Sequence, residues 1–211
     1  MLRAPALEHA ADGWFTDSMA RPRKVSDAEL LAACASAIGL HGPGFTLAHV
    51  AAAADVSVGT VVGRFGSKHQ LLVTLMETET ATLGQRMRAA GEKAANPVDA
   101  VKAAVLATSD GIDDPATTAN HLAQLGADLA DPDLRRRLAA HRQVIRTVLT
   151  ELVATAGLPS APPPRQAGAM LAALVHGAQV DWALQPKGSL HKRIRRDVDI
   201  LLDGWARTEK R

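Results

Sequence analysis

The sequence contains a single cysteine, Cys34, and no tyrosine, and aromatic residues make up only 3% of its 211 residues. One cysteine excludes a disulfide or a cysteine-only zinc site within the chain and fits a reducing, cytoplasmic location. No apolar run approaches the roughly 18–20 residues needed to cross a bilayer, so no membrane partner is expected. A basic segment followed by an apolar stretch is also missing near the N-terminus, so no secretion signal is predicted.

Positive and negative charges nearly balance, since the formal net charge is +2 and the isoelectric point is about 8.9. This balance does not by itself indicate nucleic-acid binding. Hydrophobic residues make up 47% of the chain, which is enough for a packed core. Abundant Ala, Leu, Arg and Glu, with few β-branched or aromatic runs, predict an all-α fold.

The N-terminal part shows three short helical patterns followed by a long one. Ser26, with Glu29 three residues later, forms a capping-box pattern at the start of a helix over 26–40. Thr46 and Ser57 are candidate N-caps of two further short helices, the second reaching about Phe65. Short helices joined by very short turns are typical of a helix-turn-helix domain, and the fourth helix is predicted over 67–88.

Longer helical patterns follow, and the rigid "GLPSAPPP" stretch separates two of them. We expect helices over 97–112, 117–130, 132–156, 165–185 and 190–207. The predicted organisation is a disordered tail or leader over 1–20, a helix-turn-helix DNA-binding domain over 21–70, and a larger helical effector-binding and dimerisation domain over 71–211. Met19 is a plausible first residue for the protein, so the first 18 residues are interpreted as a leader, a tag or a misplaced start.

Residues 46–68 have features suited to double-stranded DNA. The helix N-termini at Thr46 and Ser57 offer backbone N–H groups and hydroxyls to phosphates, and Lys68 adds a positive charge there. Gly59 and Gly63 remove bulk from the outer side of the third helix, which allows close approach to a major groove. Each glycine costs about 1 kcal/mol of helix stability relative to Ala, which indicates a positional reason for it.

The stretch "FTLAHVAAAADVSVGTVVGRFGSKHQLL" resembles the signature of the TetR family of bacterial repressors. The agreement covers roughly residues 24–75, in spacing as well as residue type. The resemblance implies that Thr46, Ser57 and Lys68 contact phosphates and that Gly59 and Thr60 approach bases. It also implies that three residues belong to the core, namely Val56, Val61 and Phe65.

Three positions depart from the family pattern. The family often has Lys where this chain has Val58, Tyr where it has Val62, and His or Tyr where it has Arg64. Two usual phosphate contacts are therefore lost, whereas Arg64 restores one or reads a guanine through two hydrogen bonds. Arg21, with Arg23 and Lys24, precedes the first helix and is either a DNA-binding arm or a solvated tail.

The second domain carries polar residues at otherwise apolar helix positions. Binding pockets for small molecules are mostly apolar with a few polar groups, so this pattern predicts an effector site; buried, hydrogen-bonded histidines are the alternative. No two of its histidines have the spacing of a metal pair, so no metal or other cofactor is expected. The predicted effector-binding residues are Val105, His121, Leu125, His141, Ile145, His176 and Gln179.

The helix predicted over 165–185 is apolar on more than one side and therefore needs two packing partners. One is its own domain and the other a second copy of the chain, which, with the last helix, suggests a four-helix interface. Trp182 and Trp205 are expected to be packing residues. The residues assigned to the dimer interface are Met170, Leu174, Ala178, Trp182, Leu201 and Trp205.

These patterns together predict a ligand-responsive transcriptional repressor that is not an enzyme. A homodimer would place two recognition helices in successive major grooves, ~34–36 Å apart, of a roughly palindromic operator. A small, lipophilic effector would release the DNA, with the fourth helix as the lever between domains. The alternatives are an effector-independent DNA-binding protein or an activator. A helical enzyme is more remote, since the sequence has no glycine-rich phosphate loop or nucleophile elbow.

Overall fold

The computed structural model describes residues 25–110, 112 and 114–207, and this part of the chain contains helices and no strand. The predicted tail over 1–20 and the basic residues Arg21, Arg23 and Lys24 lie outside it. The all-α prediction is confirmed for the part of the chain that is described. The elements are α1 (Asp27–His41), η1 (Gly42–Gly44), α2 (Leu47–Ala53), α3 (Val58–Phe65), α4 (Lys68–Glu92), α5 (Pro97–Ala107), α6 (Pro115–Ala130), α7 (Pro132–Ala156), α8 (Pro164–Leu184) and α9 (Leu190–Ala206).

Local chemistry explains where most helices begin. Every helix from α1 to α9 except α8 follows a Ser, Thr, Asn or Asp whose side chain accepts a backbone N–H of the first turn. The capping box predicted from Ser26 and Glu29 is present on both sides. Four helices also begin with proline, which fits the first turn because its N–H would be unsatisfied there.

The helix ends differ from prediction where packing or side chains intervene. α5 ends at Ala107, five residues before the predicted end, because Thr108 bonds the Val105 carbonyl through its hydroxyl at 2.6 Å and a turn follows. Gly39 lies inside α1 and Gly91 inside α4, although glycine often ends a helix. Both are buried at close contacts, where a Cβ on Gly39 would lie 3.0 Å from Thr117.

Two hydrophobic clusters hold the described chain together. The N-terminal cluster unites α1 to α3 with the first turns of α4, and its members Leu30, Val50 and Val61 are fully buried. Its one member from beyond α4 is Leu134, at the start of α7. α4 also reaches the second cluster through Leu83 and Met87, so it links both cores.

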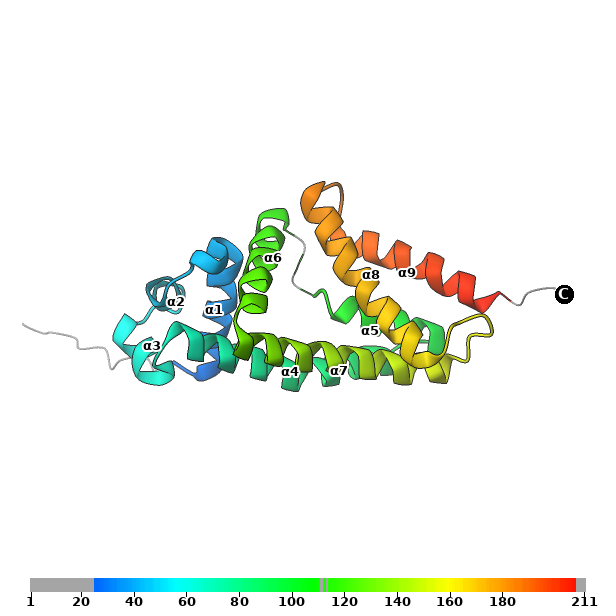
Figure 1. Cartoon of the computed structure of the whole chain (residues 1–211), viewed down its shortest axis with the longest axis horizontal. Helices are drawn as coiled ribbons and strands as arrows, with labels where there is room; N and C mark the ends of the chain where they lie inside the picture. The colour runs from blue at the N-terminus through cyan, green and yellow to red at the C-terminus, as the bar shows by residue number, and fades with distance from the viewer. Residues whose placement is uncertain (1–24, 111, 113, 208–211) are drawn as a thin grey trace, which may run out of the picture.

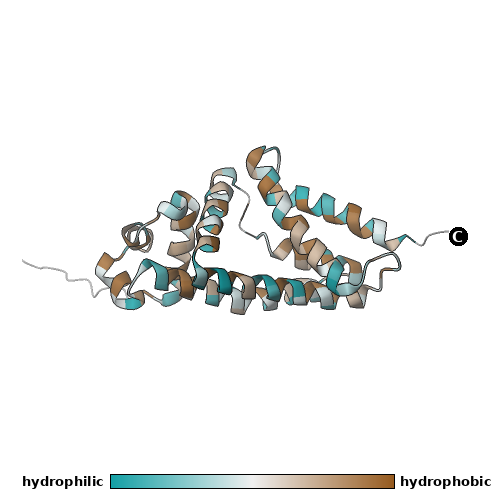
Figure 2. Cartoon of the chain, in the orientation of Figure 1, coloured by the Kyte–Doolittle hydropathy of each residue, from teal (hydrophilic) through white to brown (hydrophobic). Residues whose placement is uncertain are grey.

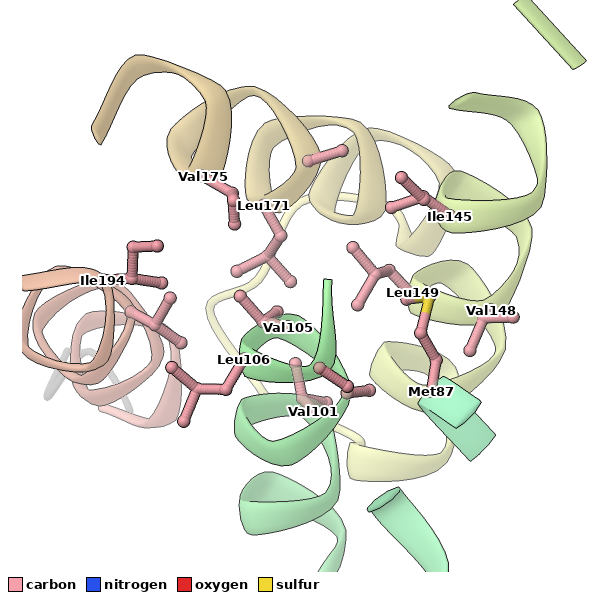
Figure 3. Packing of buried hydrophobic residues seen from close by; sticks show 14 of the residues in the cluster. Met87, Val101, Val105, Leu106, Ile145, Val148, Leu149, Leu171, Val175 and Ile194 are labelled. Carbon is pink, nitrogen blue, oxygen red and sulfur yellow. The ribbon is translucent and has the colours of Figure 1, made fainter. Parts of the chain in front are cut away.

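The second cluster fills the space among α4, α5, α7, α8 and α9. Figure 3 shows Val105 of α5 facing Leu149 of α7 and Leu171 of α8, with Ile194 of α9 on the other side. α9 alternates hydrophobic and hydrophilic residues along its length (Figure 2), as expected for a helix with one buried stripe. None of the described helices combines the length and hydropathy needed to cross a membrane.

The long helices give the molecule its elongated shape. α4 and α7 run side by side along its length, with α1 to α3 at one end and α8 and α9 at the other (Figure 1). α6 stands between these ends and packs against α1, η1, α7 and α8. Any change in α6 therefore bears on both the N-terminal helices and the larger helical domain.

Candidate nucleic-acid interface and ligand cavity

The recognition helix predicted from the sequence, α3, has one buried face and one solvent-exposed face. Val61 is fully buried and Phe65 is 7% exposed, so both belong to the core, as predicted. Val58 and Val62 are instead 43% and 41% exposed. Two large apolar side chains in water on one short helix form a surface suited to an apolar contact, such as a thymine methyl group.

The two glycines of α3 lie at the centre of its outward face. With about 3.6 residues per turn, Gly59 and Gly63 project opposite Val61 and Phe65. A Cβ at Gly63 would meet nothing within 4 Å, and one at Gly59 would meet only the Ser57 hydroxyl at 3.6 Å. Packing among the described residues therefore does not require glycine at either position, and the outward face of α3 is open to a close approach.

The caps of α2 and α3 are exposed and partly engaged. The Thr46 hydroxyl accepts the His49 N–H at 3.3 Å, and the Ser57 hydroxyl accepts the Thr60 N–H at 3.1 Å. The Ser57 and Thr60 hydroxyls also lie 3.0 Å apart. Each oxygen thus serves its own helix, while the exposed first turns still present backbone N–H groups to solvent. The contacts with phosphates and bases that the sequence predicts for these residues therefore depend on the backbone N–H groups.

Lys68 lies at the first position of α4, but its ammonium turns back into the chain. It donates to the carbonyls of Pro43 and Phe45 at 2.7 Å each and lies 4.1 Å from the centre of the Phe45 ring. Burial lowers its pKa, and nearby Cys34 opposes this shift. Lys68 is therefore a structural link between η1 and α4, with one N–H proton left for a phosphate.

Arg64 is also engaged, because its guanidinium pairs with the Asp27 carboxylate of α1. Both groups are exposed, so the pair contributes little stability. From residue 25 to residue 70 the described chain has two cations against three carboxylates, Asp27, Glu29 and Asp55. Sequence-independent attraction to DNA would therefore depend strongly on the predicted basic arm, which lies outside the described residues.

A cavity of about 510 Å³ lies between α5, α6, α7 and α8. It brings together six of the seven residues predicted to bind the effector: Val105, Leu125, His141, Ile145, His176 and Gln179. These residues come from four helices, yet each was predicted from the pattern of its own helix. The apolar wall with a few polar groups is typical of small-molecule sites.

The seventh residue, His121, lines a second cavity of about 490 Å³ next to the first. This cavity lies between α1, α4, α6 and α7, at the junction of the two clusters. Four residues border both cavities, namely Thr108, Leu125, Leu138 and His141. The His141 Nδ1 lies 3.1 Å from the Thr80 hydroxyl of α4, so a ligand that displaces this imidazole would also disturb α4.

The three predicted histidines have lowered pKa values, for which burial is the main cause in each case. For His141 the neighbouring Glu79 opposes the shift, whereas Arg142 and Arg86 add to it. For His176, Arg142 lowers the pKa further and a hydrogen bond with Gln179 opposes this. At neutral pH these side chains therefore offer neutral hydrogen-bonding groups rather than charges.

Three arginines of α7 that were not predicted from the sequence to bind a ligand also line the first cavity. They are Arg135, Arg142 and Arg146. Their spacing, seven and then four residues, places them on one side of a helix, which is the available signal. That signal is weak because an arginine stripe usually faces water.

α6 makes direct contact with the N-terminal helices. The Asn120 side chain donates to the Gly39 carbonyl of α1 at 2.8 Å, and a Cβ on Gly42 would lie 3.2 Å from the Asn120 amide oxygen. The same helix lines both cavities through Leu125. The fourth helix was the only connection between domains expected from the sequence, and α6 is a second one.

The predicted interface residues separate into two groups. Ala178, Trp182 and Trp205 are buried within a single chain, at 7%, 1% and 7% exposure, so little of their surface is left for a partner. The Trp182 indole also donates to the Gly188 carbonyl at 3.0 Å. Met170 is 41% exposed, and Leu174 and Leu201 are partly exposed, so these three can still meet a partner.

Comparison with known families gives two matches. Residues 30–75 match the family described as bacterial regulatory proteins, tetR family. Residues 97–206 match the family described as BetI-type transcriptional repressor, C-terminal. No curated protein sequence matches the chain.

Solved structures with a similar fold include three regulators. A transcriptional regulator from Rhodococcus sp. RHA1 has 24% identity and a TM-score of 0.67, with 87% of this chain and 100% of that chain covered. The fatty acid degradation regulator FadR from Bacillus halodurans has 18% identity and a TM-score of 0.67, with 85% and 99% covered. FadR from Bacillus subtilis, in complex with stearoyl-CoA, has 16% identity and a TM-score of 0.63, with 85% and 99% covered.

Proposed function

Since the chain belongs to the TetR family of bacterial transcriptional regulators, we propose that it is a repressor that a small, lipophilic effector releases from its operator. The observation that carries this proposal is the combination of an exposed, glycine-bearing α3 and a separate apolar cavity in the larger domain. The first offers a surface for duplex DNA, and the second offers a site for a ligand. We assign 21–70 to DNA binding and 71–211 to effector binding and dimerisation.

The DNA contacts in this proposal follow the faces of α2 and α3. Val58, Gly59, Thr60 and Val62 would face base edges in the major groove, with Arg64 beside them once it leaves Asp27. The first turns of α2 and α3 would donate N–H groups to phosphates. The remaining phosphate contacts are assigned to Thr46, Ser57, Lys68, Arg23 and Lys24.

A homodimer is supported by the exposed apolar residues of α8 and α9. Met170 and Leu174 lie one turn apart on α8, and Gly177 lies a further turn along the same side. Ile200 of α9 is 66% exposed, and the partly exposed Leu201 lies next to it. Two copies packing these sides together would form the four-helix interface expected from the sequence and would set the separation of the two α3 helices.

Ligand binding would act on DNA binding through α6 and α4. A ligand between α6 and α7 favours a state in which α6 is shifted, and α6 contacts α1 through Asn120 and Gly39. The shift would move α1 to α3 as a unit, because they share one core with the start of α4. Operator affinity would fall only by the ligand's differential affinity for the two states.

The lipophilic nature of the effector is supported by the cavity wall. Val105, Leu125, Ile145, Leu149 and Val175 make most of it apolar. Bacillus subtilis FadR, which has a similar fold and was solved in complex with stearoyl-CoA, supports a ligand with an acyl chain. Two cavities with a common border at His141 offer space for an extended molecule.

Selection of sequences from a pool of random duplex DNA tests the proposal. The purified protein is expected to enrich an inverted repeat whose half-sites are about ten base pairs apart, or a multiple of one helical turn. The variant Gly59→Trp, which adds bulk to the outward face of α3, serves as a control and should enrich no sequence. Recovery of unrelated sequences by the wild-type protein at low salt would overturn the proposal.

A further inference from the structure

The cavity between α5, α6, α7 and α8 has a one-sided charge distribution. Three guanidinium groups line it, those of Arg135, Arg142 and Arg146, and all three come from α7. Among the described residues that line it, none carries a carboxylate. An apolar cavity with three cations and no anion has an uncompensated positive charge.

Two of these arginines, the half-buried Arg142 and the exposed Arg146, have no partner among the described residues. Within the described chain, no hydrogen bond or ion pair joins the guanidinium of Arg142 or Arg146 to another group. Arg135 makes one weak bond of 3.3 Å, to the Leu129 carbonyl. By contrast, Arg137 on the same helix pairs with Glu77 and Asp133. The unpaired state is thus specific to the cavity side of α7.

The lack of a hydrogen-bonding partner is more unfavourable for Arg142 than for the other two arginines. It is half-buried, and burial together with the nearby charge of Arg146 lowers its pKa. A half-buried guanidinium retains five N–H donors that need acceptors. A ligand oxyanion between Arg142 and Arg146 would accept those bonds and offset the repulsion between the two cations.

The remaining residues of the cavity wall restrict the chemistry of the other end of the ligand. Leu125, Ile145, Leu149 and Val175 present aliphatic surface. Among the described residues of the wall there is no Phe, Tyr or Trp, so a quaternary ammonium group would find neither an aromatic face nor a carboxylate. An organic cation is therefore disfavoured, and an aliphatic chain fits the wall.

We propose that this cavity binds an aliphatic chain that ends in an oxyanion, with the oxyanion held by Arg142 and Arg146 and the chain packed between α6 and α8. Arg135, nearer the N-terminal end of α7, is available for a second anionic group. The oxyanion has two sources, the carboxylate of a free fatty acid or the CoA phosphates of an acyl-CoA, whose acyl chain itself ends in a neutral thioester. The inference rests on the proposed function only in taking this cavity as the effector site.

Calorimetric titration of the full chain tests the charge preference with three probes of the same chain length. These are sodium dodecanoate and dodecyltrimethylammonium, each kept below its micelle concentration, and dodecanol, kept below its solubility limit. Dodecanoate is expected to bind about 10- to 100-fold more tightly than dodecanol, because hydrogen bonds to a charged group are worth that much. Dodecyltrimethylammonium should bind most weakly. Equal affinity for dodecanoate and dodecanol, or no binding of dodecanoate, would overturn the proposal.

A double variant, Arg142→Gln with Arg146→Gln, tests the residues. It should lose the preference for dodecanoate and bind dodecanol as the wild type does, which also shows that the cavity is intact. Arg136→Gln is the matched control, because Arg136 lies on the same helix, is 73% exposed and does not line the cavity. A preference for dodecanoate that persists in the double variant would contradict the assignment.

Dodecanoyl-CoA separates the two sources of the oxyanion. If the acyl-CoA is the ligand, it should bind more tightly than dodecanoate and Arg135→Gln should weaken only the acyl-CoA; if the free acid is the ligand, dodecanoate should bind more tightly. Weak binding of both would overturn the proposal. These titrations use no DNA, so their failure is distinct from the failure of operator selection.

Discussion

At the scale of single residues, the cations of the helix-turn-helix have different roles from those that the sequence suggests. Lys68 bonds two carbonyls of η1 and its flank, and Arg64 pairs with Asp27. The outward face of α3 is left with valine, threonine and glycine, which recognise shape and methyl groups more than charge. Base recognition by this chain would therefore depend on close approach, and the glycines permit it.

Substitution of Gly63 by Ala separates stability from DNA binding. A Cβ there meets nothing within 4 Å, so the free energy of unfolding should rise by up to about 1 kcal/mol. Operator affinity should fall about tenfold or more, because the added methyl group holds α3 away from the bases. Chemical denaturation and fluorescence anisotropy measure the two effects.

Gly126→Ala is the matched control, since Gly126 lies in α6 and a Cβ there also meets nothing. It should raise stability by a similar amount and leave operator affinity unchanged. If Gly63→Ala binds the operator as well as the wild type does, α3 is not the surface that approaches the bases.

Cys34 offers a residue-scale test of the N-terminal core. Burial raises the pKa of its thiol to about 12, and nearby Lys68 opposes the shift. The reactive thiolate is then almost absent at pH 8, so iodoacetamide should label the folded protein far more slowly than the protein in guanidinium chloride. Because the pKa is higher in the folded than in the unfolded chain, this burial favours folding below about pH 9 and loses that contribution as the pH rises toward 12. Equal labelling rates would show that the core around α1 is open.

At the scale of elements, α6 has contacts that bear on signal transfer. One side of it borders both cavities, and its N-terminal half packs on α1 and η1. At its C-terminal end the chain turns into α7, where Leu134 joins the N-terminal core and Asp131 lies 3.5 Å from His69 of α4. A displacement of α6 is therefore expected to reach the helix-turn-helix through these contacts.

Replacement of Asn120 by Ala tests this connection. The variant loses the 2.8 Å bond to the Gly39 carbonyl, which is worth about 1 kcal/mol. Dodecanoate affinity should stay within about twofold of wild type, whereas the ligand-induced loss of operator affinity should shrink about fivefold. Gln85→Ala, which removes an exposed amide from α4, is the control. Coupling equal to that of the wild type would assign the signal to α4 instead.

The order and approximate bounds of the helices were predictable from the sequence. Side chains that cap helices act locally, so Ser26, Thr46 and Ser57 identify their helices without any tertiary information. The glycines were less informative, because Gly39 and Gly91 are set by contacts with α6 and α5. Those contacts join different helices, and no local pattern encodes them.

At the scale of the whole molecule, six of the residues predicted to bind the effector line one cavity, but its charge was not predicted. His141 and His176 interrupt apolar faces, so each one marks its helix as a cavity wall. Arg142 and Arg146 were missed, because polar residues beside a buried stripe normally face water. Which of them faces a cavity depends on where α6 and α8 pack, and that is a tertiary property.

The interface prediction was only partly compatible with the structure for a related reason. α8 is apolar on several sides, and periodicity alone does not say which side packs within the chain. The structure buries the side with Trp182 in its own core and leaves the side with Met170 exposed. The proposed dimer therefore rests on the exposed sides of α8 and α9.

The most direct test of the account measures operator affinity as a function of cavity occupancy. Fluorescence anisotropy with the selected operator duplex, at fixed salt, gives the dissociation constant with and without saturating sodium dodecanoate, and calorimetry on the same samples confirms that the acid is bound. The account predicts a loss of operator affinity of about 5- to 150-fold and an equal loss of dodecanoate affinity when operator is present. Unchanged operator affinity in samples with a filled cavity would contradict it.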